Sequence, residues 1–182
     1  LLAVGPMVAA LAGGNRVLVK MSEPTPATGA LFERLVAAAF PQGEAVVVNG
    51  GPDGAQSFCR LPFDHLLFTG SSPVGRHVMR AAAENLVPVT LELGGKSPAI
   101  LGRGFGVAEA AHRILYGKCL NAGQTCIAPD YALVPRESVA EFVRHAGDAV
   151  RSFYPPLATN PDYTPIVDER HRRRLKGLVE DA

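Results

Sequence analysis

The sequence is poor in cysteine. It has three cysteines in 182 residues, an odd number, and no Cys-x-x-Cys pair. A disulfide framework needs an even, regularly spaced set, so we expect none and favour a reducing compartment, the cytoplasm. Cys59 and Cys119 fall in apolar or helical surroundings, where a cysteine usually serves as a packing residue.

The sequence also lacks an excess of charge of either sign. Eighteen Lys and Arg residues are set against 17 Asp and Glu residues, which leaves a net charge of +1. That balance gives no reason to expect a nucleic-acid partner. The basic run at residues 170–174 is interrupted by His171, and we interpret it as the solvated face of a helix rather than a binding patch.

Long apolar runs are missing as well. Gly, Pro and charged residues interrupt each one before it reaches the length of a membrane span. The first twelve residues are apolar but lack a basic start and a cleavage site, so we do not interpret them as a signal peptide. There is no initiator Met either, and we expect the chain to be an internal piece of a longer protein.

The apolar segments that are present predict helices and strands in alternation. Each strand is short and rich in branched residues, and each helix shows apolar residues near helical spacing. Alternation at short intervals is typical of an α/β layer with a mainly parallel sheet. Strands are expected at residues 16–20, 45–48, 65–68, 87–91, 99–101 and 131–134, and helices at 1–13, 27–40, 53–60, 73–85, 107–117, 138–153 and 169–181.

A carboxylate and a thiol stand out on two separate loops. The run VTLELGGKSPAI places Glu92 at a strand end, before a Gly-Gly turn, and the loop NAGQTCIAP carries Cys126, 34 residues later. A cysteine is the strongest side-chain nucleophile, and a nearby carboxylate can activate it or the water that later attacks its adduct. A lone cysteine is more often structural, so the hypothesis of a catalytic pair depends on both residues.

Two other segments could bind a ligand. The run FTGSSPVG joins a strand, a small turn with Gly70 and Ser71, and a helix start with Gly75. Backbone N–H groups there favour a phosphate, although GxGxxG is absent and an ordinary strand–turn–helix is the alternative. Lys20 and Glu23 flank a turn at a strand end, the usual ligand edge of an α/β sheet. Alone, such residues are most often surface charges.

Four motifs together resemble the aldehyde dehydrogenase superfamily: GNRVLVKMSEPTP, FDHLLFTGSSPVGR, LELGGKSP and GQTC. They stand in that family's order and spacing, and the resemblance runs from about Leu1 to Val179. Within the superfamily, three longer stretches are similar to the class 3 and coniferyl aldehyde dehydrogenase branch. These are PVTLELGGKSP, YGKCLNAGQTCIAPDY and DERHRRRLKGLV.

The resemblance implies a Rossmann-like, parallel-sheet cofactor domain over residues 1–92 and part of an α/β catalytic domain over residues 93–182. The implied cofactor is NAD, with NADP as a second option, and no metal is implied. Gly70, Ser71 and Gly75 match the family's pyrophosphate loop. Lys20 and Glu23 match its ribose-binding pair, with Glu23 favouring NAD. Leu93 would line the nicotinamide end.

The resemblance also implies a reaction. Cys126 would attack an aldehyde, and Glu92 would activate the water that hydrolyses the resulting thioester to an acid. The implied substrate is an aromatic aldehyde such as coniferyl aldehyde, or a medium-chain aliphatic one, and the implied assembly is a homodimer. Asn121 is expected to order the cysteine loop rather than react. The alternatives are a non-catalytic relative and an enzyme that uses coenzyme A as acceptor, whose family members typically lack the Glu.

Overall fold

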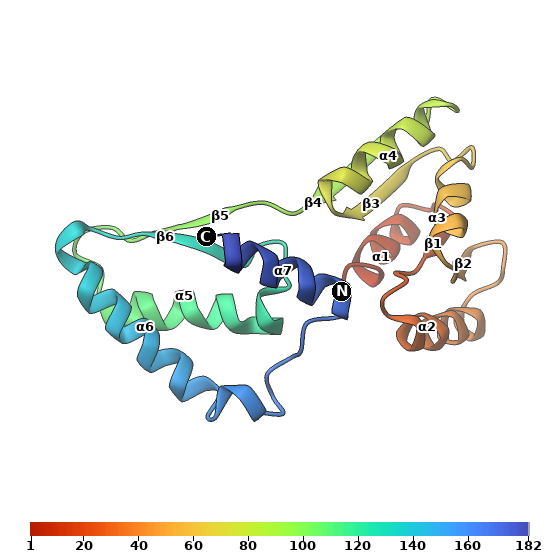
Figure 1. Ribbon diagram of the computed structural model, residues 1–182. Helices are drawn as coiled ribbons and strands as arrows, with labels where there is room; N and C mark the ends of the chain where they lie inside the picture. Colours follow the sequence, from red (N-terminus) through yellow and green to blue (C-terminus); the bar gives the residue numbers. More distant parts are fainter. Residues whose placement is uncertain (182) are drawn as a thin grey trace. The chain divides into compact units, whose positions relative to one another are not determined.

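A computed structural model describes residues 1–181 of the chain, which divide into two compact units, residues 1–93 and residues from Gly94 onward (Figure 1). Both units alternate strands with helices, as the sequence predicts. The first unit comprises α1 (Val4–Ala12), β1 (Val17–Lys20), α2 (Pro26–Ala39), β2 (Ala45–Val48), α3 (Pro52–Cys59), β3 (Leu66–Gly70), α4 (Ser72–Ala83) and β4 (Val89–Leu93). The second comprises β5 (Ser97–Ile100), α5 (Val107–Cys119), β6 (Pro129–Leu133), α6 (Val139–Phe153) and α7 (Glu169–Asp181), with short 3-10 helices at Leu120–Gly123, Arg136–Ser138 and Leu157–Thr159.

The strands pair in parallel, which confirms the predicted class of sheet. Within the described residues they form three pairs, β1 with β2, β3 with β4, and β5 with β6. Parallel strands need a crossover between them, and α2, α4 and α5 supply it in the three pairs. The β3–β4 register sets Thr69 opposite Glu92 and Gly70 opposite Leu93. Two of the sequence-predicted site residues therefore end neighbouring strands.

Two apolar clusters form the core of the first unit. In one cluster, the helix residues Met7 and Val36 pack with Ala45 and Val47 of β2. The other cluster gathers residues of β3, of α4 and of the turn after it: Leu66, Val78, Ala82 and Val87. Burial of apolar side chains contributes about 25 cal/mol per Å² removed from water. These clusters therefore fix each strand pair against its helices.

The first helix expected from the sequence is confirmed as α1, but its apolar side chains are not all buried. Met7 is buried, but Leu2, Val4 and Val8 are exposed. The helix is apolar on all sides. Only the side that carries Met7 packs against the neighbouring apolar cluster. Hydropathy alone could not indicate which side that would be.

Several strand boundaries differ from the prediction. β3 continues through Thr69 and Gly70, which the sequence suggested were a turn. Strands β5 and β6 begin earlier than expected and include Pro98 and Pro129. Proline cannot donate to a strand ladder but is tolerated at a strand start or an irregular position. Pro129 is the first residue of β6, and the register shifts between Ser97 and Pro98.

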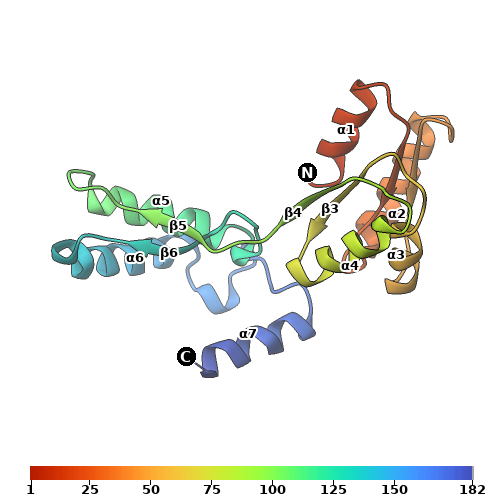
Figure 2. The ribbon, with the colours of Figure 1, turned by 90° about the horizontal axis from the view of Figure 1, so that it is seen from above.

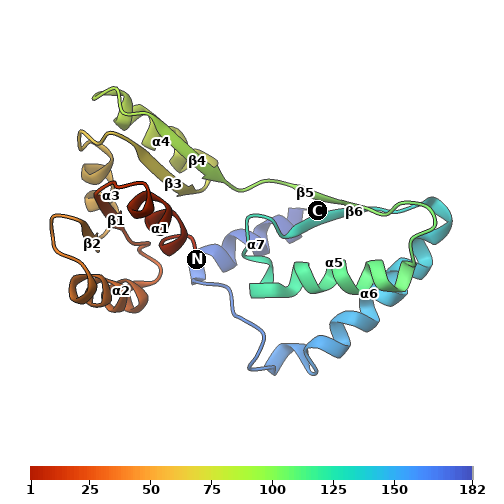
Figure 3. The ribbon, with the colours of Figure 1, turned by 180° about the vertical axis from the view of Figure 1, so that it is seen from behind.

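Helices α5 and α6 lie side by side in the second unit, as seen in Figures 2 and 3. An aromatic cluster joins their ends. The ring of Phe153 lies 4.9 Å from His112 and 6.0 Å from Tyr116 between centroids, both edge to face. Such contacts stabilise a pair beyond simple burial. They fix the C-terminal turn of α5, from which the loop with Cys126 departs.

Candidate active site

Lys20 and Glu23 lie together where β1 ends. Lys20 is the last residue of that strand, and its Nζ donates to Oε1 of Glu23 in the following turn. Burial raises the pKa of Glu23, but the hydrogen bond and the positive charge of Lys20 outweigh it, and the net pKa is below its usual value. The pair therefore holds an ionised carboxylate at the carboxyl end of a parallel strand, where it can accept hydrogen bonds from hydroxyl groups.

The start of α4 offers backbone donors to an anion. Gly70 ends β3, and Ser71 is the N-cap residue of α4, but no side chain caps the helix. Its first N–H groups therefore keep their donor capacity, and the helix dipole adds partial positive charge there. Ser71 and Ser72 are exposed. This arrangement fits the pyrophosphate of a dinucleotide.

Gly75 sits in the first turn of α4, where the helix meets β4. It is buried, and a Cβ atom placed on it would lie 3.1 Å from Cδ2 of Leu93. The absence of a side chain therefore allows α4 to approach the end of β4 closely. Leu93, the residue expected at the nicotinamide end, therefore lies close against this turn of α4.

Replacing Gly75 with valine is expected to push Leu93 and α4 apart. Overpacking of this kind costs about 1–3 kcal/mol, so we expect a lower melting temperature and weaker binding of NAD, measured by thermal denaturation and calorimetry. Gly54→Val is a matched control because Gly54 lies in α3, and apart from its chain neighbours and the backbone of its own helix no heavy atom lies within 4 Å of the place that a Cβ atom would take there. Equal effects of the two variants would contradict the packing role of Gly75.

Glu92 lies on the open face of β4. The strand alternates, with Leu91 and Leu93 half-buried and Thr90 and Glu92 exposed, as the period of two requires. Thr90 is engaged by His65, with 2.9 Å between its Oγ1 and Nε2 of the imidazole. No residue in the described part of the chain forms a hydrogen bond or an ion pair with the Glu92 side chain. Its carboxylate is available to act on a water molecule.

Cys126 is exposed on the loop between α5 and β6. The other two cysteines are not: Cys119 is buried and Cys59 half-buried, and burial raises the pKa of both thiols. Among residues 1–181, none accepts a hydrogen bond from the backbone N–H of Cys126. A nucleophile and an unused donor therefore share one residue, the arrangement that an oxyanion site needs.

The loop reaches Cys126 through an unusual backbone. Asn121, Ala122 and Gly123 all have positive φ angles, of 52°, 53° and 74°. A residue with a Cβ pays roughly 1–2 kcal/mol for this conformation. Asn121 offsets part of it by donating from Nδ2 to the carbonyl oxygen of Gln124, at 3.2 Å. Asn121 therefore orders the loop, as the sequence suggested.

Gln124 is the residue that sequence reasoning missed. Its Nε2 donates to the carbonyl oxygens of Asn121 at 3.0 Å and Pro165 at 3.1 Å, and its Oε1 accepts from the N–H of Val167 at 2.9 Å. The signal in the sequence was its place in the motif GQTC, two positions before the cysteine. Its partners 41 and 43 residues away could not be foreseen.

The Gly-Gly-Lys turn after β4 carries an ion pair to β6. Lys96 Nζ lies 2.5 Å from Oδ2 of Asp130 in β6. Lys96 is largely exposed, so this pair contributes little stability.

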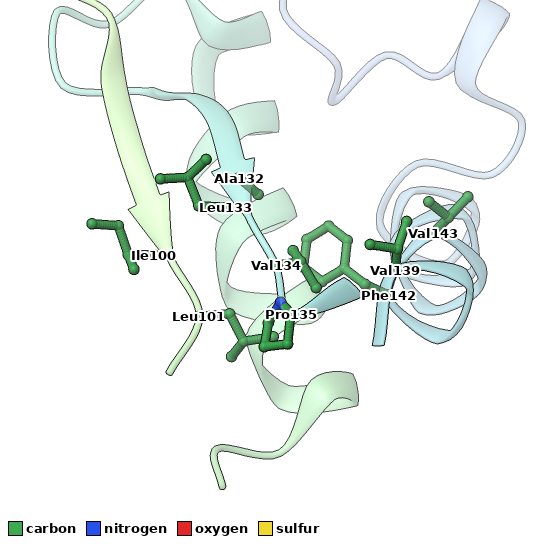
Figure 4. Close-up of a pocket in the computed structure, with 9 residues that line it drawn as sticks. All are labelled: Ile100, Leu101, Ala132, Leu133, Val134, Pro135, Val139, Phe142 and Val143. Carbon is green, nitrogen blue, oxygen red and sulfur yellow. The ribbon is translucent and has the colours of Figure 1, made fainter. Parts of the chain in front are cut away.

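An apolar pocket lies at the other end of β6 from Cys126 (Figure 4). It has a volume of about 660 Å³ and is lined by side chains such as Ile100, Leu133, Phe142 and Val143. It contains no acid, base or nucleophile, so we place no chemistry there.

Elsewhere in the described residues, no cluster of three or more His, Cys, Asp or Glu side chains could hold a metal ion. Nor does any helix in residues 1–181 have the length and apolar character needed to cross a bilayer.

This α/β fold, the exposed loop cysteine and the open helix start agree with a match to a known family. The model of the aldehyde dehydrogenase family matches residues 1–182. The chain belongs to the aldehyde dehydrogenase family.

Relatives within the family include proteins named for coniferyl aldehyde. A probable coniferyl aldehyde dehydrogenase of Pseudomonas aeruginosa is 58% identical over 181 residues, covering all of this chain and 38% of that protein. The coniferyl aldehyde dehydrogenase of a Pseudomonas species is 50% identical over the same length and share. The chain therefore spans about two fifths of the length of these curated relatives.

Solved structures share the fold. Staphylococcus aureus AldH, in a substrate-bound state, superposes with a TM-score of 0.92 at 41% identity, over 98% of this chain and 39% of that one. Aldehyde dehydrogenase C of Pseudomonas syringae, solved with NAD+ and octanal, gives 0.85 at 33% identity, over 96% and 37%. Both similarities cover the first and the second unit.

Proposed function

We propose that the protein carrying this chain is an NAD(P)-dependent aldehyde dehydrogenase that converts an aldehyde to a carboxylic acid. The observation that carries the proposal is Cys126, an exposed thiol with an unused backbone N–H on a loop ordered by Asn121 and Gln124. An exposed nucleophile beside an oxyanion donor suits attack on a carbonyl group.

Cys126 begins the reaction. Its thiolate attacks the aldehyde carbon, and the carbonyl oxygen becomes the oxyanion of a thiohemiacetal, which the Cys126 N–H can stabilise. Bound NAD supplies the acceptor for the hydride that leaves this adduct. Its loss converts the adduct on the sulfur into a thioester, and the carbon–sulfur bond then has to be broken by water.

Glu92 completes the reaction as the general base. Its exposed and unpaired carboxylate can take a proton from water, whose oxygen then attacks the thioester carbon and releases the acid and the Cys126 thiolate. A relative that passes its acyl group to coenzyme A has no need of this base. The presence of Glu92 therefore favours hydrolysis.

The first unit supplies residues suited to bind the cofactor. Lys20 and Glu23 would hold the adenosine ribose hydroxyls, and the start of α4 at Gly70 and Ser71 would receive the pyrophosphate. Gly75 and Leu93 would shape the nicotinamide end. On this assignment residues 1–92 belong to the NAD(P)-binding domain and residues 93–182 to the catalytic domain.

For the substrate, we propose an aromatic aldehyde such as coniferyl aldehyde, or a medium-chain aliphatic one. The names of the curated relatives support the first, and octanal bound to a structural relative supports the second. We further propose a homodimer in the cytoplasm. Three cysteines without a disulfide agree with a reducing compartment.

The test of the proposal is NADH formation by the whole protein with a panel of coniferyl, benzyl and aliphatic aldehydes. NADH and acid formed in equal amounts would support aldehyde oxidation, and the preferred aldehyde would define the substrate class. Turnover only with coenzyme A present would point to acyl transfer instead. Tight NAD binding without NADH from any aldehyde would favour a non-catalytic relative.

Replacing Glu23 with alanine is expected to improve the use of NADP. The ionised carboxylate repels a 2′-phosphate and accepts hydrogen bonds from a free 2′-hydroxyl. Its removal should lower the KM for NADP and raise that for NAD, which changes the ratio of kcat/KM by about tenfold, worth about 1.4 kcal/mol. Steady-state kinetics with both cofactors measures this, and Glu44→Ala, an exposed residue outside the site, is the control. If the ratio of kcat/KM for the two cofactors did not change, Glu23 would not be a ribose-binding residue.

A further inference from the structure

Gln124 joins the cysteine loop, residues 120–126, to a distant segment of the second unit. We propose that Gln124 is the positioning residue for the Cys126 thiol, a role that rests on the proposed function. The amide head group has two N–H donors and one carbonyl acceptor. All of these are engaged: the donors by the carbonyls of Asn121 and Pro165, and the acceptor by the N–H of Val167.

The cysteine loop depends on such an attachment. It lies between α5 and β6 and passes through two left-handed residues that carry a Cβ, Asn121 and Ala122. A backbone in that region persists only when surrounding contacts determine it. Among the described residues, Gln124 is the one loop residue whose side chain forms hydrogen bonds with a segment remote in sequence. It also closes the loop on itself, since its own N–H and Nε2 both donate to the carbonyl of Asn121 at 3.0 Å.

The far end of this attachment is itself fixed. Val167 is followed by Asp168, whose Oδ1 accepts from the N–H of His171 at 2.7 Å at the start of α7. The carbonyl of Asp168 accepts from the N–H of Arg172 at 3.0 Å. The segment 165–167 is therefore an extension of a helix start rather than a free loop. Gln124, which stands two positions before Cys126, therefore connects the cysteine loop to this ordered helix start.

Position matters because carbonyl attack requires close alignment. A displacement of about 1 Å can cost about a hundredfold in rate while substrate binding changes little. The expected effect of losing the attachment is therefore on kcat rather than on KM. Gln124 itself neither donates a proton to the substrate nor binds the cofactor in this scheme.

The test uses Gln124→Leu and Gln124→Glu in the whole protein, with Gln42→Leu as control. Gln42 is an exposed glutamine in the first unit. Gln124→Leu keeps a branched side chain, one bond shorter, and removes all three side-chain hydrogen bonds. We expect hydrogen exchange of the Val167 amide, followed by mass spectrometry, to rise at least about tenfold, and kcat to fall at least about tenfold with KM within about threefold. Gln42→Leu should match the wild type in both measurements.

The Gln124→Glu variant provides a pH readout and a second route if the leucine variant does not fold. A carboxylate can still accept from Val167 but repels the carbonyls of Asn121 and Pro165, whereas a protonated carboxyl group donates to one of them. The ratio of kcat in this variant to the wild type should therefore rise at least threefold between about pH 8 and about pH 5.5. A ratio that stays constant with pH would overturn the proposal.

The exchange measurement separates this proposal from the function on which it rests. Unchanged exchange at Val167 in Gln124→Leu would overturn the attachment, and faster exchange with unchanged kcat would overturn its role in positioning. If the wild type oxidises no aldehyde while exchange at Val167 still rises in the variant, the aldehyde dehydrogenase function has failed, and the positioning role for that reaction falls with it, although the attachment is real.

Discussion

Aldehyde oxidation is expected to be lost when Cys126 is replaced by alanine. The methyl side chain cannot form the thiohemiacetal, so neither hydride loss nor acyl transfer has a covalent intermediate to proceed from. We expect kcat to fall by at least about a thousandfold, as is usual when a nucleophile is removed. NADH formation with the preferred aldehyde measures the loss.

Binding measurements distinguish lost chemistry from lost structure in this variant. Cys126 is exposed and packs in neither of the apolar clusters, so the melting temperature and the Kd for NAD should stay close to the wild-type values. Cys59→Ala is the matched control: Cys59 packs against the cluster that contains Leu66, and its loss should cost some stability but change kcat by no more than about twofold. Substantial turnover by Cys126→Ala would disprove the assignment of the nucleophile.

The sequence predicted those parts of the fold that depend on local pattern. Short branched runs, apolar helix faces and glycine turns are local signals, and they predicted the strands and α-helices of the two units to within a few residues. Lys20 and Glu23 were also predictable as neighbours, since they are separated by three positions around one turn. The family motifs then suggested what each local feature could bind.

What the sequence could not predict depends on contacts between distant residues. The hydrogen bonds of Gln124 to Pro165 and Val167 join segments with no shared pattern. The exposure of Val4 and Val8 in α1 depends on which side of an all-apolar helix finds a partner. The left-handed conformation of Ala122 contradicts its own preference, so only the packed structure reveals it. Each of these follows from tertiary contacts that override local propensity.

A burst of NADH followed by slow turnover is expected from Glu92→Gln. A carboxamide has nearly the shape of the carboxylate but cannot take a proton from water, so the thioester on Cys126 should form at close to the normal rate and then persist. We expect about one equivalent of NADH per active site in the burst and a steady-state kcat lower by about 10²–10⁴-fold, the range typical of general-base removal. Stopped-flow absorbance measures both phases.

A strong added nucleophile identifies the step that Glu92 serves. Hydroxylamine attacks a thioester without a general base. Added after a single burst has used up the aldehyde, which it would otherwise convert to an oxime, it should release the acyl group of Glu92→Gln as a hydroxamate and free Cys126 for a second burst. The wild type, whose thioester has already been hydrolysed, should give no hydroxamate. Glu44→Gln, which changes an exposed glutamate outside the site, should behave like the wild type throughout. Slow turnover with no burst would mean that Glu92 acts before hydride loss, by activating the Cys126 thiol. In that case hydroxylamine would have no thioester to attack, and the base for hydrolysis would have to be another group.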